Sequence, residues 1–225
     1  KIAEAESCIH RAIALADYLY GHESAHAVFS RTNLLYLYDV AGRPEEVESL
    51  GRQLLLNQKV LDNYKLYEIT IRTMFAKSIL DQGRSQSAEV ESRILLKRVF
   101  GLLREDHPFA GSAFELLGRS LVGQGKYQEA EQPLRSAIAI WARTKGWTWR
   151  VGRAASVLGE SLVGQGRNAE AEKYLTYASA ALEHVPEGQL ELHAKQEHAE
   201  RLQKLRMTMQ QASMGPTRVA ELPGI

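Results

Sequence analysis

The stretch His-Glu-Ser-Ala-His at residues 22–26 has the residue types and spacing of a zinc site. On a continuous helix, His22 and His26 would lie one turn apart and could bind Zn²⁺, with Glu23 as general base. Gly21 stands directly before them and weakens a continuous helix, and no obvious third ligand follows at metalloprotease spacing. We therefore expect this stretch to lie in a connection between helices, and we predict no metal site.

A second chemical signal is Ser-Leu-Val-Gly-Gln-Gly-Lys at residues 120–126, which returns with a final arginine at 161–167. A glycine-rich stretch ending in a basic residue can belong to a phosphate-binding loop of the pattern G-x-x-x-x-G-K-[ST]. The spacing excludes that interpretation, because Ser120 stands where the first glycine is required and Tyr127 follows the lysine. We predict no nucleotide and no other cofactor.

Isolated reactive side chains do not change this picture. Cys8 lies among apolar residues of an expected helix, which predicts a buried and inert thiol. His193 and His198 are five residues apart and would face different sides of a helix, so we expect solvated side chains. No pair of carboxylates recurs in a setting that suggests acid–base catalysis. The sequence therefore predicts no enzymatic activity in this region.

The sequence is built from a repeated unit. A glycine followed by a basic residue recurs at steps of 41, 42 and 41 residues, at Gly42, Gly83, Gly125 and Gly166. Six residues after each of these glycines stands a glutamate, namely Glu48, Glu89, Glu131 and Glu172. We assign these glutamates to solvated helix starts, where a negative charge suits the helix dipole. A fixed period of this length is typical of repeat proteins.

Each unit is predicted to be a pair of helices joined by a tight turn. Apolar residues recur at helical spacing on both sides of the glycine: Phe114, Leu117 and Leu121 before it, and Ala130, Leu134 and Ala137 after it. Glycine suits the turn because a helix commonly ends in a left-handed conformation. Gly118, inside the first helix, would let the two helices approach closely.

This pattern resembles the tetratricopeptide repeat (TPR). The matching residues are Leu117, Gly118, Gly125, Ala130, Leu134 and Ala137. The resemblance implies an all-α fold, a right-handed superhelix (α-solenoid) of antiparallel helix pairs with a C-terminal capping helix. The units are longer than the usual period of about 34 residues. In this they resemble the kinesin-light-chain type of TPR, which is also common in bacterial signalling proteins.

The predicted organisation follows the repeat. The expected segments are a truncated first repeat with only its second helix (1–22), repeats at 24–62, 65–106, 109–146 and 149–184, a capping helix (188–212) and a tail (213–225). Because Lys1 falls inside a unit, we expect the chain to be part of a longer protein. The truncated repeat would leave an apolar face around Ile9, Ala12 and Ile13 uncovered, which favours self-association.

Composition narrows the class of partner. Lys and Arg number 28 against 27 Asp and Glu, and the net charge of +1 does not favour nucleic acid or a membrane surface. No apolar run of about 18 residues suggests a membrane span. The single cysteine excludes an internal disulfide and favours a reducing compartment. We therefore expect a cytoplasmic protein whose partners are proteins or peptides.

The resemblance also implies a concave groove lined by the first helix of each pair. The groove-facing positions hold Phe29, Thr32, Tyr36, Asp39, Thr70, Thr73, Lys77, Leu80, Ser112, Glu115, Arg119, Val122, Arg153, Ser156, Glu160 and Val163. Their mixture of aromatic, hydroxyl, acidic and basic groups suits a peptide held by side-chain hydrogen bonds and a few charges. We expect Arg119 and Arg153 to face solvent, where both could meet a ligand carboxylate.

Two tryptophans, Trp147 and Trp149, lie where one repeat passes into the next. One interpretation is that they fill the gap between the units. The other is that they contact a partner, because tryptophan is enriched at binding hot spots.

Two functions are compatible with this sequence. The first is a non-catalytic protein–protein interaction module, part of a larger multidomain signalling protein such as a bacterial serine/threonine kinase. The alternative is a small-ligand or peptide sensor that regulates an attached effector domain. A preformed, deep apolar pocket in the groove would favour the sensor, whereas a shallow polar groove would favour the interaction module.

Overall fold

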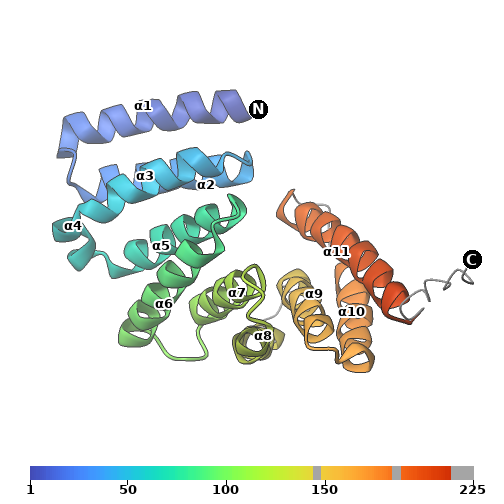
Figure 1. Ribbon diagram of the computed structural model, residues 1–225. Coiled ribbons are helices and arrows are strands. Elements are labelled where there is room, and N and C mark those ends of the chain that lie inside the picture. The colour runs from blue at the N-terminus through green and yellow to red at the C-terminus, as the bar shows by residue number, and fades with distance from the viewer. Residues whose placement is uncertain (144–147, 184–188, 214–225) are drawn as a thin grey trace, which may run out of the picture.

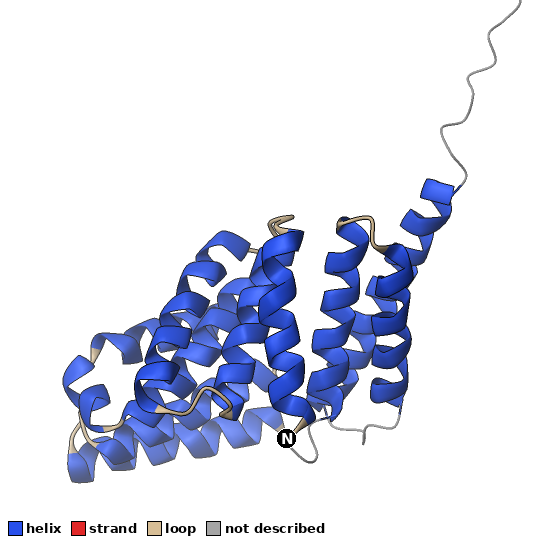
Figure 2. Cartoon of the chain, turned by 90° about the horizontal axis from the view of Figure 1, so that it is seen from below, coloured by secondary structure: helices blue, strands red, loops and turns tan. Residues whose placement is uncertain are grey.

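The computed structural model describes residues 1–143, 148–183 and 189–213, and every regular element in these ranges is an α-helix. The helices are α1 (Ile2–Tyr20), α2 (Ala25–Val40), α3 (Pro44–Leu56), α4 (Gln58–Asn63), α5 (Lys65–Asp81), α6 (Ser85–Leu102), α7 (Pro108–Val122), α8 (Tyr127–Ala142), α9 (Thr148–Gly164), α10 (Asn168–Glu183) and α11 (Gln189–Ser213). Figure 1 shows an arc of helices packed side by side, and Figure 2 shows the described helices joined by short connections. The predicted all-α solenoid of helix pairs is confirmed. Among the described helices, none is long and apolar enough to span a bilayer.

The second helix of the first complete pair is interrupted. α3 ends at Leu56, and the short α4 begins at Gln58. Between them, the side chain of Asn57 accepts a hydrogen bond from the backbone N–H of Val60 at 3.4 Å. Asparagine is a favoured N-cap, so it stabilises the start of a new helix at this point. The repeat pattern did not predict this break.

The turn glycines have the predicted left-handed conformation. Gly42, Gly83, Gly125 and Gly166 have φ between 69° and 76°. At each turn the next residue donates its backbone N–H to a carbonyl five residues earlier, as from Lys126 to Leu121 at 2.9 Å. This bond is part of the Schellman motif that ends many helices. No atom lies within 4 Å of a Cβ built on these glycines, so the backbone angle rather than space requires glycine.

Glycines inside the first helices have a different role. A Cβ on Gly118 would lie 2.5 Å from Cγ of Leu134, and one on Gly159 would lie 2.7 Å from Cγ of Leu175. Both distances are far below a van der Waals contact. The predicted close approach of the two helices of a pair is therefore confirmed.

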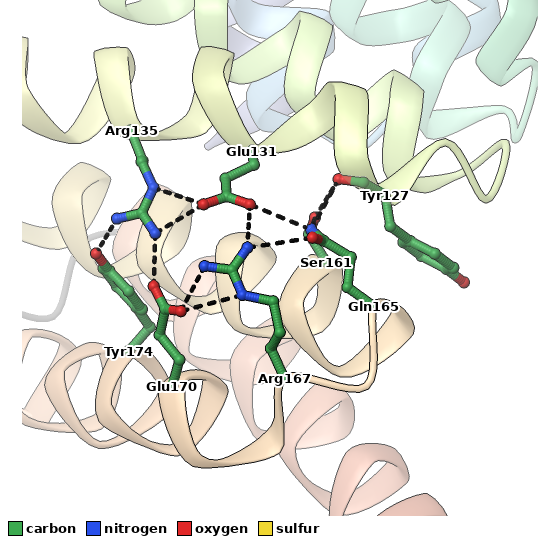
Figure 3. Close-up of polar contacts among 8 residues, drawn as sticks. All are labelled: Tyr127, Glu131, Arg135, Ser161, Gln165, Arg167, Glu170 and Tyr174. Atoms are coloured by element: carbon green, nitrogen blue, oxygen red, sulfur yellow. Dashed lines mark hydrogen bonds and ion pairs between the residues drawn. The ribbon is translucent and has the colours of Figure 1, made fainter.

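Polar contacts between consecutive units join the solenoid at one edge. Figure 3 shows the contact between the last two pairs, where Glu131 of α8 accepts a hydrogen bond from Gln165 at 3.4 Å and forms an ion pair with Arg167. Gln165 and Arg167 flank the turn glycine of the following unit. We call this arrangement the turn staple, in which a glutamate on the second helix of one unit binds the basic residue of the next turn.

The turn staple recurs along the chain. Its glutamate and basic-residue pairs are Glu6 with Arg43, Glu48 with Arg84, Glu89 with Lys126, and Glu131 with Arg167. A glutamine before the glycine adds a second donor in three of the four, namely Gln82, Gln124 and Gln165. The prediction that the repeated glutamates are solvated is therefore wrong for Glu48, Glu89 and Glu131. The sequence shows them at a helix start but does not show that the next turn folds back onto them. Glu172 alone of the predicted set is exposed.

Candidate functional site

A cavity of about 450 Å³ opens on the inner side of the arc, between α2, α5, α7 and α9. These are the first helices of the pairs, as the sequence predicted for a groove. The predicted groove residues that line this cavity are Tyr36, Asp39, Thr70, Thr73, Lys77, Ser112, Glu115, Arg119 and Arg153. Helical spacing places these residues on one face of each helix, and stacking of the pairs brings the four faces together.

Apolar and aromatic side chains form much of the wall, including Met74, Phe109, Leu116 and Trp149. Sequence reasoning missed Phe109, which lies at the first turn of α7. It is positioned by His107, the N-cap of α7, whose Nδ1 accepts a hydrogen bond from the backbone N–H of Phe109 at 3.1 Å. The two rings stack with centroids 5.4 Å apart. The His-Pro pair before α7 was the available signal, because it marks a helix start.

Lys77 lies at the α2–α5 side of the cavity between two carboxylates. Its Nζ is 2.7 Å from Asp39 and 2.6 Å from Asp81. Burial by itself would lower the pKa of Lys77, but the charges of Asp81 and Asp39 outweigh burial and raise this pKa above its ordinary value. Lys77 is therefore a fixed positive charge that is already neutralised by the protein.

Arg153 and Glu115 form a buried ion pair that joins α9 to α7. Both guanidinium nitrogens Nε and Nη2 donate to the carboxylate, the second at 2.7 Å, and the exposed fraction of the Arg153 side chain is 11%. The expectation that Arg153 faces solvent is therefore wrong. Helical offset places its Cα on the groove face, but the long side chain reaches the carboxylate of the neighbouring unit.

Arg119 is also not solvent-facing as expected. Its side chain is 12% exposed and contacts Asp81 at 3.8 Å and Glu197 of α11 at 3.3 Å. Both arginines of the predicted carboxylate site thus already have carboxylate partners within the chain. A ligand carboxylate would have to share or replace these partners.

Arg150 is a cavity residue that sequence reasoning did not select. Its guanidinium lies 4.7 Å from the ring centroid of Trp149 and donates to Ser112 Oγ at 3.3 Å. Burial lowers the pKa of Arg150, and the nearby charge of Arg153 lowers it further. This end of the cavity thus places the guanidinium groups of Arg150 and Arg153 beside the indole ring of Trp149.

Trp149 is buried, and its ring packs with Leu182 and Ala194. The gap-filling interpretation therefore describes its position, although its edge also lines the cavity. Trp147 lies outside the described residues.

The remaining predicted groove residues lie elsewhere. Phe29 is exposed and outside the cavity, and Thr32 is buried with its hydroxyl donating to the carbonyl of Val28 at 2.8 Å. Ser156 and Glu160 are contacted by α11. The structure therefore brings together predicted groove residues of all four first helices, but it leaves Phe29 and Thr32 of α2 and Ser156 and Glu160 of α9 outside the cavity.

His198 of α11 is one of the residues that contact Ser156. Its Nδ1 lies 2.9 Å from Ser156 Oγ, and its Nε2 lies 2.9 Å from Ser179 Oγ. The prediction of a solvated His198 is therefore wrong, because α11 packs this face against α9 and α10. The side chain of His193 lies outside the described residues.

The His-Glu-Ser-Ala-His stretch does not form one helical face, because α2 begins only at Ala25. His22 lies in the preceding connection with Nδ1 2.9 Å from Asp17, and the ring of His26 stacks on Tyr20 with centroids 4.2 Å apart. In the part of the chain that the structure describes, no three metal-ligating side chains cluster.

The first helix presents an apolar surface that differs in part from the prediction. Ala12 is exposed as expected, but Ile9 and Ile13 are half-buried against the solenoid. The large exposed apolar side chains of this helix are Ile2, Leu15, Tyr18, Leu19 and Tyr20. Cys8 is also exposed, so the prediction of a buried thiol is wrong. The thiol lies on the side of α1 that no described helix covers.

Comparison with known proteins identifies the repeat. A family model described as tetratricopeptide repeat matches residues 112–145. Among solved structures, TPR-like repeats of Podosopora anserina assigned to a kinesin light chain are 21% identical, with a TM-score of 0.64 over 80% of this chain and 86% of that chain. BtubC (BKLC) from P. vanneervenii is 20% identical, with a TM-score of 0.65 over 100% of this chain and 98% of that chain. A search of curated proteins gives no match. The family model thus identifies a tetratricopeptide repeat within residues 112–145, and the described part of the chain has the α-solenoid fold of kinesin-light-chain-like TPR repeats.

Proposed function

We propose that this chain is a non-catalytic interaction module that binds a segment of a partner protein along its concave groove. A TPR-like solenoid is a scaffold for protein–protein interaction. The observation that carries the proposal is the cavity of about 450 Å³ between α2, α5, α7 and α9. A cavity of this size accepts one large side chain or a small ligand, since ligand pockets occupy about 300–1,000 Å³.

The chemistry of the wall suggests the kind of segment. Met74, Phe109 and Trp149 offer an apolar and aromatic surface for one anchoring side chain. The charged residues of the wall are the cations Lys77, Arg119, Arg150 and Arg153 and the anions Asp39 and Glu115. Lys77, Arg119 and Arg153 already pair with carboxylates of the chain, so an acidic group next to the anchor would have to compete with these carboxylates for the cations.

A second candidate is a small-ligand sensor, and the apolar part of the wall favours it. The cavity is lined largely by carbon atoms, which is the property expected of a ligand pocket. In either case we propose a cytoplasmic setting within a larger signalling protein. The kinase context rests on the resemblance alone.

Tyr36 and Phe29 provide a matched test. Both are exposed aromatic residues of α2, but only Tyr36 lines the cavity. We expect Tyr36→Ala to lose partners captured from the source lysate by the full chain, whereas Phe29→Ala keeps them. Thr73→Trp, which fills the cavity from α5, should have the same effect as Tyr36→Ala.

The readout separates the two candidates. A partner detected by cross-linking and mass spectrometry supports the interaction module, and a small molecule seen in native mass spectrometry of the purified chain supports the sensor. Retention of every partner and ligand by folded Tyr36→Ala and Thr73→Trp variants would exclude the cavity from either function.

A further inference from the structure

The C-terminal helix α11 covers groove residues of α9. Figure 1 shows α11 beside α9 and α10 at the end of the arc. The guanidinium of Arg201 bonds to Glu160 Oε2 at 2.6 Å and to Ser156 Oγ at 3.0 Å. Ser156 is fully buried as a result, although the sequence places it on the groove face. A helix of the same chain therefore holds the positions at which a partner could bind.

α11 also reaches toward the central cavity. Glu197, one residue before His198, lies 3.3 Å from Arg119 of α7. Glu197 lines a second hollow of about 580 Å³, which shares Lys77, Arg119 and Arg153 with the first cavity. The two hollows thus form one continuous concave surface, and α11 forms its C-terminal border.

The contacts of α11 are mainly polar. Its buried apolar residues within the described part are Ala194 and Leu205, and only Ala194 joins a core cluster, with Trp149 and Leu182. By contrast, the larger cluster between α7, α8, α9 and α10 contains the buried leucines Leu117, Leu121, Leu134, Leu158 and Leu162. Polar contacts can be replaced by water at small net free energy, whereas buried apolar surface cannot. Separating α11 from α9 and α10 should therefore cost less free energy than separating the helix pair α7–α8 from the pair α9–α10.

We propose that α11 is a displaceable autoinhibitory helix that covers the C-terminal part of the groove. In the docked state, its Arg201 occupies Ser156 and Glu160, and its Glu197 occupies Arg119. In the released state, these three groove residues are open to a partner. A partner that uses them must displace α11, so partner binding and release of α11 are thermodynamically coupled. What α11 inhibits rests on the proposed function, but its displacement does not.

Arg201 and Gln203 allow a controlled test by hydrogen–deuterium exchange of the full chain. Arg201→Glu places a negative charge against Glu160, whereas Gln203→Glu adds a negative charge at an exposed position of the same helix. We expect Arg201→Glu to reduce the protection of α11 amides at least about tenfold, which corresponds to about 1.4 kcal/mol. The protection of α9 and α10, and that of α11 in Gln203→Glu, should stay at wild-type values.

Two outcomes of the exchange experiment would overturn the proposal. If α9 and α10 lose protection together with α11, then α11 is an integral part of the solenoid. If α11 keeps its protection in Arg201→Glu, Arg201 does not hold it.

A second measurement asks whether release opens the groove. Ser156→Cys is introduced into a Cys8→Ser chain, and its reaction with a thiol reagent is followed with and without Arg201→Glu. We expect the reaction to be at least about tenfold faster with Arg201→Glu, and an equal rate would contradict the proposal. Neither measurement needs a partner. Failure to capture a partner protein would therefore count against the proposed function but would not bear on the proposal that α11 can be displaced.

Discussion

Gln124 of one repeat donates its side-chain N–H to the carboxylate of Glu89 in the preceding repeat, with Nε2 and Oε2 2.8 Å apart. Lys126, on the other side of the turn glycine, reaches the same oxygen at 2.8 Å. The two donors come from the most regular part of the sequence, the glycine turn. The residues of the repeated turn sequence therefore also form the contact between consecutive units.

The turn staple should contribute measurably to stability. Glu89→Ala removes the carboxylate that Gln124 and Lys126 share, which we expect to lower the free energy of unfolding by about 1–3 kcal/mol. Glu172→Ala makes the same change at the exposed counterpart in the last repeat and should have an effect below about 0.5 kcal/mol. Urea denaturation at pH 7 measures both. Equal losses would show that the turn staple adds nothing.

The contribution of Glu89 to the free energy of unfolding should depend on pH. Hydrogen bonds from Lys126 and then Gln124 lower the pKa of Glu89 from 4.5 to about 2. A lowered pKa in the folded state stabilises the protein above the unfolded pKa, and this stabilisation is lost as pH falls toward the folded pKa. The stability difference between wild type and Glu89→Ala should therefore shrink between pH 4.5 and about pH 2, the window between these two pKa values. A constant difference would contradict the role of the charge.

Two helical glycines should respond to alanine in opposite directions. In Gly118→Ala, the new methyl group would lie 2.5 Å from Leu134, so we expect a loss of about 1–3 kcal/mol from overpacking. Gly101, near the end of α6, has no atom within 4 Å of its Cβ position. Gly101→Ala should raise stability by about 0.5–1 kcal/mol through helix propensity. Thermal unfolding of both variants tests whether close packing or the helix itself requires Gly118.

Docking of α11 should weaken in acid. Burial, and then the charges of Arg201 and Arg206, lower the pKa of His198 below its ordinary value of 6.5. The groups that face His198 are Ser156 on α9, Ser179 on α10, and Arg201 and Arg206 on α11, and Arg201 is itself paired with Glu160 on α9. Because the docked state binds fewer protons, the contribution of His198 to docking is fully present above pH 6.5 and decreases as pH falls toward and through the lowered pKa.

His198→Gln provides the control for this pH dependence, since glutamine can bond to both hydroxyls but does not titrate. Protection factors of α11 amides, corrected for intrinsic exchange, should fall between pH 7.5 and pH 5.5 in wild type and stay constant in His198→Gln. A fall of the same size in both would assign the effect to another group.

The purified chain should not bind stoichiometric zinc at residues 22–26. His22 lies in the connection before α2 and contacts Asp17, whereas His26 lies in the first turn of α2 and stacks on Tyr20. The two imidazoles therefore do not share a helical face. Elemental analysis after dialysis against zinc checks this. About one zinc per chain, lost in a His22→Ala and His26→Ala double variant, would show that the stretch rearranges into a metal site.

Periodicity predicted much of this fold but not the partners of its long side chains. The glycine turns and the close approach at Gly118 are local consequences of residue type, so the sequence alone located them. The pairing of Arg153 with Glu115 depends on how two units stack, and both residues were predicted only as neighbours on the groove face. The contacts of His198 with Ser156 depend on where α11 docks. No repeat pattern specifies that position.

The turn staple also has a direction. In each unit, the glutamate binds the turn of the following unit, and the turn binds the glutamate of the preceding unit. Consider a copy of one whole repeat inserted between two existing repeats. The turn of the copy would bind the glutamate of the repeat before it, and the glutamate of the copy would bind the turn of the repeat after it. The array could thus lengthen or shorten by gene duplication or deletion of whole periods without leaving an unpaired charge at the new junction. Only Glu172, at the last repeat, would keep its place at the end of the series.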